Sequence, residues 1–345
     1  MALNAIDQAW VRPNLVSYGH SFLAETGLDN EADYYGRRLA AFGEMTYLKR
    51  AVGGSLIESA VNVMLTGNPW IAGTNKVLLI QGLINTARKN GADPATRRGA
   101  EHALRTMCAL GSSMETIEED TPFFDYSGTW NTNLDGEFHG GACKSTAVVG
   151  SYVEFTVPAY GSHFLSVARK VGLAGATIQF RRLDTGAVFK TWTNLEQAQA
   201  DISRNYVPAA ISMNVPAGTR VRATLTASSS GATLVCDGLI VPSTQPTAVL
   251  LMKEPHLLDY SHSEMFPNGS DAALDYFNSI LDTMANEFSN VIVADPNTAG
   301  YWDKAHDILP DGVHPNSNGH LALYATMLEA IHKTLSRKAY EGGLR

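Results

Sequence analysis

The stretch Lys76-Val77-Leu78-Leu79-Ile80-Gln81 is a continuous apolar run with a polar residue at each end. A run of this kind is typical of a parallel strand that is buried on both faces of its sheet. Helical and extended patterns alternate on either side of it, so we expect a parallel sheet with helices on both faces. The fold class predicted for this part of the chain is α/β.

Other elements of the predicted α/β domain can be placed by their periodicity. Further strands are expected at residues 15–18, 45–52, 248–253 and 291–294. Helices are expected at residues 31–42, 55–65, 93–110 and 271–288 and again after residue 314. The residues predicted to face the core from three of these helices are Tyr34, Leu39, Phe42, Leu274, Phe277, Leu281, Met284, Phe288, Leu321, Tyr324, Leu328 and Ile331.

Residues 121–243 have a different character, because the helical period is lost. Short runs rich in Val, Thr and aromatic residues occur at residues 151–157, 176–181, 187–193 and 220–227. Clusters of Gly, Pro, Asn, Asp and Ser separate them, which is typical of an all-β, jelly-roll-like sandwich. Since the α/β pattern resumes afterwards, we predict an inserted β-sandwich at 119–245 within a discontinuous catalytic domain at 1–118 and 246–345.

The composition excludes several functional classes. Charged residues make up 17% and hydrophobic residues 45% of the chain, which fits a soluble globular protein. A net charge of −8 without any Lys/Arg-rich run argues against a nucleic-acid partner. No stretch approaches the roughly 18 consecutive apolar residues of a membrane span. The first residues lack the apolar core of a signal peptide, so a cytoplasmic location is predicted.

Neither a metal nor another cofactor is predicted. The chain has three scattered cysteines, which are Cys108, Cys143 and Cys236. They are too few for a disulfide framework or a zinc site, so we expect three thiols, with a bridge between the last two as the alternative. His256, His262 and Asp259 suggest a metal, but their spacing fits no standard site and favours solvated loops.

The segment Asp311-Gly312-Val313-His314 places a carboxylate and an imidazole three residues apart, so one short turn can present both. A serine hydroxyl is a poor nucleophile at neutral pH and needs such a base together with a group that orients the base. Ser21 follows the first predicted strand and completes a triad as the nucleophile. His314 is then the base and Asp311 the orienting carboxylate, with Asp303 and Asp307 as alternatives to Asp311.

An acyl-transfer site also needs hydrogen-bond donors for the developing oxyanion. The candidates are the backbone N–H groups of Ser21 and Gly54 and the side-chain amide of Asn85. Each residue also has a purely structural interpretation, because Ser21 can cap a helix, Asp311 can cap a turn, and Gly54 and Asn85 can be loop residues. The occurrence of all four favours catalysis. Leu23 replaces the second glycine of a G-x-S-x-G elbow, which disfavours a standard α/β-hydrolase.

In order and spacing, four segments resemble the sequence blocks of the SGNH (GDSL-type) hydrolase family: Gly19-His20-Ser21, Gly54, Gly82-Leu83-Ile84-Asn85 and Asp311-Gly312-Val313-His314. The resemblance covers about residues 12–110 and 246–337. It implies a flavodoxin-like, three-layer α/β/α domain and metal-free ester hydrolysis. Ser21 would be the nucleophile, and Ser21, Gly54 and Asn85 the oxyanion donors. This chain has His20 where the first block usually carries Asp. In the third block, two residues separate Gly82 from Asn85, whereas the family usually has one.

The inserted stretch is similar to β-sandwich modules of some SGNH esterases that act on polysaccharides, including phage and prophage proteins. Its segments Ser127-Gly128-Thr129-Trp130, Gly140-Gly141 and Ser151-Tyr152-Val153-Glu154-Phe155 carry this likeness. The likeness implies an O-acylated glycan as substrate, and association with a virion as an alternative to the cytoplasm. Trp130, Trp192 and Tyr206 either stack on sugar rings or belong to the core of the sandwich.

The predicted function is therefore that of a serine esterase that removes O-acetyl groups from a polysaccharide through an acyl-enzyme. One alternative is a short-chain lipase or thioesterase, in which the sandwich is a lid or a surface for homo-oligomerisation. The other is a catalytically weak, glycan-binding component of a virion or an adhesion structure.

Overall fold

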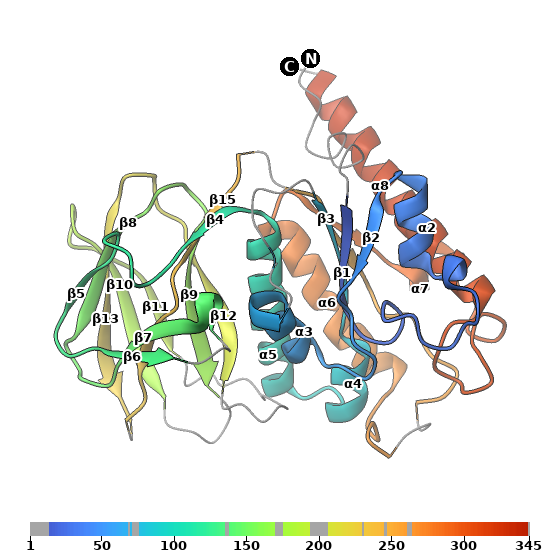
Figure 1. Ribbon diagram of the computed structural model, residues 1–345, viewed down its shortest axis with the longest axis horizontal. Helices are drawn as coiled ribbons and strands as arrows, with labels where there is room; N and C mark the ends of the chain where they lie inside the picture. The colour runs from blue at the N-terminus through green and yellow to red at the C-terminus, as the bar shows by residue number, and fades with distance from the viewer. Residues whose placement is uncertain are drawn as a thin grey trace. The chain divides into compact units, whose positions relative to one another are not determined.

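The computed structural model describes residues 14–67, 70, 76–134, 138–169, 175–193, 206–229, 231–244, 247–260 and 264–343 (Figure 1). The chain divides into two compact units. The first comprises Met1–Ala60, Thr74–Asp93 and Gln245–Arg345, and the second comprises Val61–Gly73 and Pro94–Thr244. The domain boundaries expected at residues 118 and 246 stay a prediction. In the structure, helix α5 (Pro94–Gly111) belongs to the second unit.

The first unit is built on a five-stranded parallel sheet. Its strands are β1 (Asn14–Gly19), β2 (Thr46–Lys49), β3 (Lys76–Gln81), β16 (Val249–Met252) and β17 (Val291–Ala294). They lie in the order β17-β16-β3-β1-β2, and every neighbouring pair is parallel. Numbered within this sheet, the order is 2-1-3-4-5, which is the flavodoxin-like order. The predicted α/β class is confirmed, and the apolar run of β3 forms the central strand.

Helices cover both faces of this sheet (Figure 1). On one face, α2 (Tyr35–Phe42) contacts α8 (Ser317–Gly343), and on the other α4 (Ile84–Asn90) contacts α6 (Asp271–Glu287). The shorter elements are a 3₁₀ turn at Glu31–Asp33, α3 (Ile57–Asn62) and α7 (Pro296–Ala299). The end of α3 and the π-helical turn that follows it (Val63–Gly67) belong to the second unit. The first unit thus has three layers.

The predicted core faces are correct for one helix and partly wrong for two others. In α6, all five predicted residues from Leu274 to Phe288 are buried. Phe42 is the last residue of α2 and is 57% exposed, because the buried residues of that helix end at Ala40. Leu321 is 46% exposed, since the buried stripe of α8 runs through Leu323, Met327 and Ile331.

A buried histidine at the start of α8 makes the folded state sensitive to acid. His320 lies against the rings of Tyr34 and Tyr35, with ring centroids 4.8 and 6.1 Å away. Neither of its ring nitrogens has a hydrogen-bond partner among the residues described. Burial, together with the charges of Arg38 and His314, lowers the pKa of His320 to about 3. The ring therefore stays neutral in the folded chain at pH values where the unfolded chain binds a proton.

We expect the His320→Leu variant to lose less stability than the wild type between pH 7 and pH 5. A folded-state pKa below the unfolded value means that the unfolded chain takes up the proton first as the pH falls below 6.5. Urea unfolding at the two pH values should show a difference of about 2 kcal/mol between the two proteins. Burial also lowers the pKa of His102, to about 4. Because His102 is present in both proteins, its contribution to the pH dependence cancels in the comparison. An equal loss of stability in both would contradict this prediction.

The second unit consists of antiparallel strands and α5. Its strands are β4 (Ser113–Ile117), β5 (Asp125–Ser127), β6 (Asn131–Leu134), β7 (Ala142–Thr146), β8 (Tyr152–Thr156), β9 (Ser162–Arg169), β10 (Ala176–Arg182), β11 (Val188–Thr193), β12 (Tyr206–Met213), β13 (Arg220–Ser228), β14 (Leu234–Cys236) and β15 (Leu239–Pro242), with a 3₁₀ turn at His139–Gly141. They form sheets in the orders β11-β10-β13-β8-β5, β12-β9-β15-β4 and β14-β7-β6. Phe155 and Phe180 of the first of these sheets and Phe164 of the second share one hydrophobic core.

The three cysteines are buried, and the aromatic residues considered as sugar-stacking candidates pack against other side chains. All three cysteines are buried and free, so the expectation of three thiols is confirmed and the bridge does not form. Trp130 and Trp192 are partly buried against the shared core. Tyr206 stacks on Phe138 with ring centroids 5.3 Å apart. These contacts favour the core interpretation of the three aromatic residues.

Candidate active site

Polar residues gather at the carboxyl ends of the parallel strands. Ser21 follows β1, Gly54 follows β2, Asn85 follows β3 and Glu254 follows β16. In open parallel sheets, ligands bind at this edge where the strand order reverses, which in this sheet is between β1 and β3. At that point the His20 amide donates to the carbonyl oxygen of the last residue of β3 (3.1 Å).

Ser21 lies in a tight turn that a glycine makes possible. Gly19 has φ +146°, and a Cβ there would lie 1.7 Å from the Gln81 carbonyl oxygen, so no larger residue fits. The next turn closes when the amides of Leu23 and Ala24 donate to the His20 carbonyl oxygen (3.1 and 2.9 Å). Across the described part of the chain, neither the Ser21 hydroxyl nor its amide N–H has a hydrogen-bond partner. Both groups are therefore available to a ligand.

Asp311 and His314 form a hydrogen-bonded pair within one turn. The Asp311 Oδ2 atom lies 2.6 Å from His314 Nδ1, while Oδ1 accepts from the amides of Val313 and His314 (2.9 Å each). Gly312 has φ +73°, and a Cβ there would lie 2.5 Å from the Cβ of Asp259. The glycine is thus required both by the backbone conformation and by the neighbouring loop.

The surroundings of Asp311 favour its ionised form. Partial burial opposes ionisation, but the hydrogen bonds from the amides of His314 and Val313 and from the His314 ring outweigh it and lower the pKa of Asp311. An ionised carboxylate only accepts hydrogen bonds, so His314 Nδ1 carries the proton and Nε2 is left as the basic nitrogen. This is the tautomer that a general base in a triad requires.

The loop that carries Ser21 lies against the turn that carries His314. The ring of Phe22 meets the ring of His314 edge to face at 6.1 Å. A Cβ at Gly27 would lie 2.9 Å from Leu309 and 3.7 Å from His314. Among the described contacts, Ser21 and His314 share no hydrogen bond. Catalytic hydrogen bonds are often long without a substrate and tighten when it binds.

The candidate oxyanion donors are linked to the Ser21 turn. The Val52 amide and the Ser55 hydroxyl both donate to the Gly19 carbonyl oxygen (3.0 and 2.7 Å), so the loop of Gly54 is fixed beside β1. Gly54 is exposed, with φ +73°, and its amide has no acceptor among the described residues. Asn85 is buried and donates one amide hydrogen to the Ser55 carbonyl oxygen (3.1 Å), and no described residue accepts its other amide hydrogen.

The two alternative carboxylates, Asp303 and Asp307, have hydrogen-bond partners other than His314. Asp303 Oδ2 is 2.8 Å from Nδ1 of His306, and the Asp303 amide donates to Asp307 (2.7 Å). Asp303 and His306 therefore form a second Asp-x-x-His pair with a similar hydrogen bond between carboxylate and imidazole. Its side chains are 59% and 79% exposed, whereas those of Asp311 and His314 are 28% and 21% exposed.

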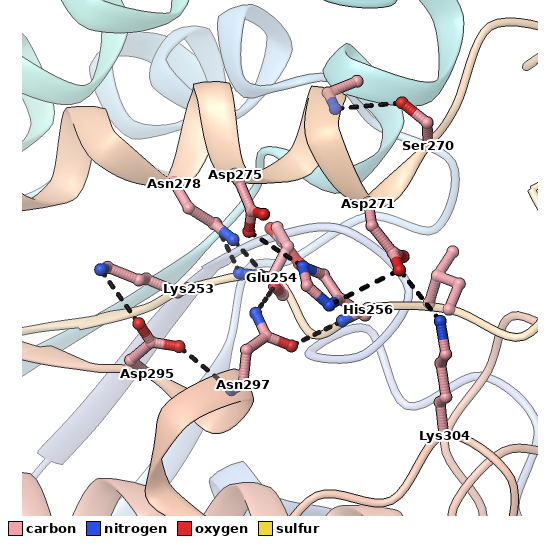
Figure 2. Close-up of polar contacts among 12 residues, drawn as sticks. Lys253, Glu254, His256, Ser270, Asp271, Asp275, Asn278, Asp295, Asn297 and Lys304 are labelled. Atoms are coloured by element: carbon pink, nitrogen blue, oxygen red, sulfur yellow. Dashed lines mark hydrogen bonds and ion pairs between the residues drawn. The ribbon is translucent and has the colours of Figure 1, made fainter.

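His256 belongs to a polar cluster at the start of α6 (Figure 2). Its Nε2 atom lies 2.9 Å from Asp275, and its Nδ1 atom lies 3.7 Å from Asp271, which also pairs with Lys304 (2.9 Å). A search of the described residues finds no group of three His, Cys, Asp or Glu side chains suited to a metal. Asp259 is held by its amide, which donates to Gly312 (2.9 Å), and His262 lies outside the described residues.

Two buried residues near the site were not anticipated from the sequence. Glu254 is fully buried and accepts hydrogen bonds from His20, Gln81 and Leu83. The sequence feature that could have identified Glu254 is its position directly after an apolar strand, at the edge of the sheet where ligands bind. Arg88, one turn after Asn85 in α4, is 3% exposed, with its guanidinium 5.0 Å from the Phe266 ring centroid. Nothing in the local pattern identified Arg88, because a helix with a buried polar face has no amphipathic period.

Comparisons with known proteins give a partial likeness. No family model matches the chain, and no curated protein matches it. Among solved structures, it is similar to the porcine torovirus hemagglutinin-esterase, with 10% identity over 92% of this chain and 86% of that chain and a TM-score of 0.41. A lipolytic G-D-S-L protein from Veillonella parvula has 10% identity over 92% of this chain and 96% of its own, with a TM-score of 0.41.

A two-domain esterase active on acetylated mannans has 9% identity over 69% of this chain and 94% of its own, with a TM-score of 0.33. These names describe those proteins, and the function of this chain rests on its own residues. None of its described helices has the length and apolar character that a membrane crossing demands.

Proposed function

We propose that this protein is a serine ester hydrolase. The observation that carries the proposal is the Asp311–His314 pair, with its 2.6 Å hydrogen bond, placed against the loop of Ser21, whose hydroxyl has no hydrogen-bond partner among the described residues. A nucleophile, a base and an orienting carboxylate are the three groups that acyl transfer through serine requires.

The proposed reaction is a double displacement. The Ser21 Oγ attacks the ester carbonyl carbon while His314 Nε2 takes the hydroxyl proton, and Asp311 stabilises the imidazolium that forms. The tetrahedral intermediate collapses when His314 returns this proton to the departing alcohol, which leaves the acyl group on Ser21. A water molecule then attacks the acyl carbon, with His314 again as the base, and the carboxylic acid is released.

The oxyanion of the tetrahedral intermediate would be stabilised by the amides of Ser21 and Gly54 and by the free amide hydrogen of Asn85. We expect Asn85→Ala to lower kcat by about 10²–10³-fold, which is the usual cost of losing one such donor. The loss should appear in kcat more than in KM, because the interaction forms only in the transition state. Asn90→Ala is a matched control in the same helix, since the Asn90 amide donates to its own helix at Thr86 (3.2 Å). Equal kcat values for the two variants would contradict the role of Asn85.

The proposed substrate is an O-acetylated glycan, with the second unit as an inserted β-sandwich that binds or positions the polysaccharide. Sugar rings stack on exposed aromatic faces and hydrogen-bond to polar side chains around them. In this unit, the side chain of Tyr160 is 67% exposed. This exposed ring supports a carbohydrate ligand, as does the likeness of this stretch to modules of phage esterases.

Release of p-nitrophenol from p-nitrophenyl acetate and from longer acyl esters tests the reaction class. Release of acetate from acetylated polysaccharides then tests the substrate class. Hydrolysis that is fastest for acetate supports the proposal. A preference for long acyl chains would instead indicate a lipase or thioesterase. Binding to a polysaccharide without turnover of any ester would indicate a glycan-binding component and would contradict the catalytic proposal.

A further inference from the structure

A fully buried carboxylate connects the ends of three strands beneath the candidate active site. Glu254 follows β16, and its side chain is 0% exposed. Its Oε1 accepts from the Leu83 amide (2.7 Å), and its Oε2 accepts from the Gln81 side-chain amide (3.2 Å). His20 Nε2 lies 3.1 and 3.0 Å from the two oxygens. Three donors, from the loop after β1, the last residue of β3 and the loop after β3, thus converge on this one carboxylate.

The backbone of Glu254 is also fixed from two helices (Figure 2). Its amide donates to Asn278 Oδ1 of α6 (2.8 Å), and its carbonyl oxygen accepts from Asn278 Nδ2 (2.9 Å). The carbonyl oxygen accepts a further hydrogen bond from Asn297 of α7 (3.0 Å). The carboxylate therefore has a defined position relative to the sheet, and the loops that donate to it take their position from it.

His20 transmits this position to the nucleophile and the base. Its Nδ1 atom accepts from the Phe22 amide (3.3 Å), so the ring proton is on Nε2, which donates to Glu254. Ser21 lies between these two bonded residues. The His20 and Phe22 rings meet edge to face at 4.7 Å, and the Phe22 ring contacts His314 at 6.1 Å. The contacts thus run from Glu254 through His20 and Phe22 to His314.

The same carboxylate positions the helix of the candidate oxyanion donor. Leu83, whose amide donates to Glu254, is the N-cap residue of α4 and has no side-chain cap of its own. Asn85 lies two residues later, in the first turn of that helix, and donates to Ser55. A shift of the Glu254 carboxylate would therefore displace both the nucleophile turn and the amide of Asn85.

We propose that Glu254 is a positioning residue, which aligns Ser21 and Asn85 with each other through a buried Glu254–His20 pair beneath the Asp311–His314 pair. This inference rests on the esterase function proposed above. A displacement of reacting groups by about 1 Å can cost about 10²-fold in rate, so alignment of this kind affects kcat directly.

Glu254→Gln tests the proposal with almost no change in volume. The new carboxamide can still accept from the Leu83 amide, but its NH₂ group faces the Nε2–H of His20. The Gln81 amide loses its acceptor at that position, and the single remaining oxygen is shared between the Leu83 amide and His20. We expect His20 to move its proton to Nδ1 and to lose the bond from the Phe22 amide. We expect kcat for p-nitrophenyl acetate to fall by about 10–100-fold, with little change in KM. The ¹⁵N NMR signals of His20 should show the change of tautomer.

Asp237→Asn is the matched control. Asp237 is a buried carboxylate of the second unit, and burial raises its pKa well above the usual range. Its conversion to an amide should leave kcat unchanged. His20→Asn is a second variant in case Glu254→Gln does not fold. The shorter side chain can accept from the Phe22 amide two residues on but does not extend as far as imidazole toward Glu254, and we expect a lower kcat for it as well.

The outcomes separate this inference from the function on which it rests. A lower kcat in both variants, with KM and the thermal midpoint preserved, supports the positioning role. A wild-type rate in both variants, while Ser21→Ala is inactive, overturns the positioning role and leaves the esterase intact. A fall in kcat that is matched by loss of the folded state in both variants also overturns it. A wild-type chain without Ser21-dependent hydrolysis overturns both proposals.

Discussion

Replacing Ser21 with alanine is expected to lower kcat for p-nitrophenyl acetate by about 10⁶-fold, the scale of loss when a triad nucleophile is removed. Without the hydroxyl no acyl-enzyme can form, and the Asp311–His314 pair has no nucleophile to activate. The alanine is also expected to fold normally, because the Ser21 side chain makes no hydrogen bond to any described residue. Steady-state hydrolysis of p-nitrophenyl acetate by both proteins measures the effect.

A covalent probe gives a second measurement of the same residue. A fluorophosphonate should modify the wild-type chain once, at Ser21, and should leave Ser21→Ala unmodified. Ser279→Ala is a suitable control, because its hydroxyl is on the exposed side of α6 and donates to its own helix at Tyr276 (2.8 Å). Ester hydrolysis that persists in Ser21→Ala, or labelling at another serine, would refute the assignment.

Replacing Asp311 with asparagine is expected to lower kcat by about 10⁴-fold while the turn is preserved. The asparagine oxygen can still accept from the amides of Val313 and His314, which now bond to Asp311 Oδ1. Its NH₂ group, however, replaces the oxygen that faces His314 Nδ1. The imidazole then takes the wrong tautomer, and Nε2 carries a proton when it should accept one. The loss should appear in kcat, because substrate binding does not depend on this proton.

The chain provides its own control for this substitution. Asp303 and His306 have the same spacing and a similar hydrogen bond (2.8 Å), but both are largely exposed. Asp303→Asn should therefore retain the wild-type rate. If Asp303→Asn is inactive and Asp311→Asn is active, the orienting carboxylate has been assigned to the wrong pair.

These two pairs show how far the sequence can identify the site. Spacing alone does not distinguish Asp303–His306 from Asp311–His314, because it describes a turn and not its surroundings. The sequence favours the second pair only through its occurrence together with the Ser21, Gly54 and Asn85 segments. The contact of His314 with the loop of Ser21 depends on chain segments far apart in sequence, and no local pattern encodes it.

The parallel sheet was predictable because β3, β16 and β17 are apolar runs, but α4 was not. Its residues from Ile84 to Arg88 are all buried, polar and apolar alike, so no alternation of faces marks a helix. Asn85 therefore looked like a turn residue, although it lies in the first turn of that helix. Glu254 was missed for a related reason, because the partners of a buried carboxylate come from other strands.

Most of the second unit lies in sequence between two paired strands of the first, which has a consequence for how the chain reaches its native state. Leu78 of β3 pairs with Val249 of β16, and the whole stretch Pro94–Thr244 is synthesised between them. During translation, β3 can pair with β1 on one side, but its other edge has no partner until the second unit has emerged. Unpaired apolar edges are prone to aggregation, and closing so long a loop slows folding. Rapid independent folding of the β-strands between these two halves would shorten the time for which that edge is exposed.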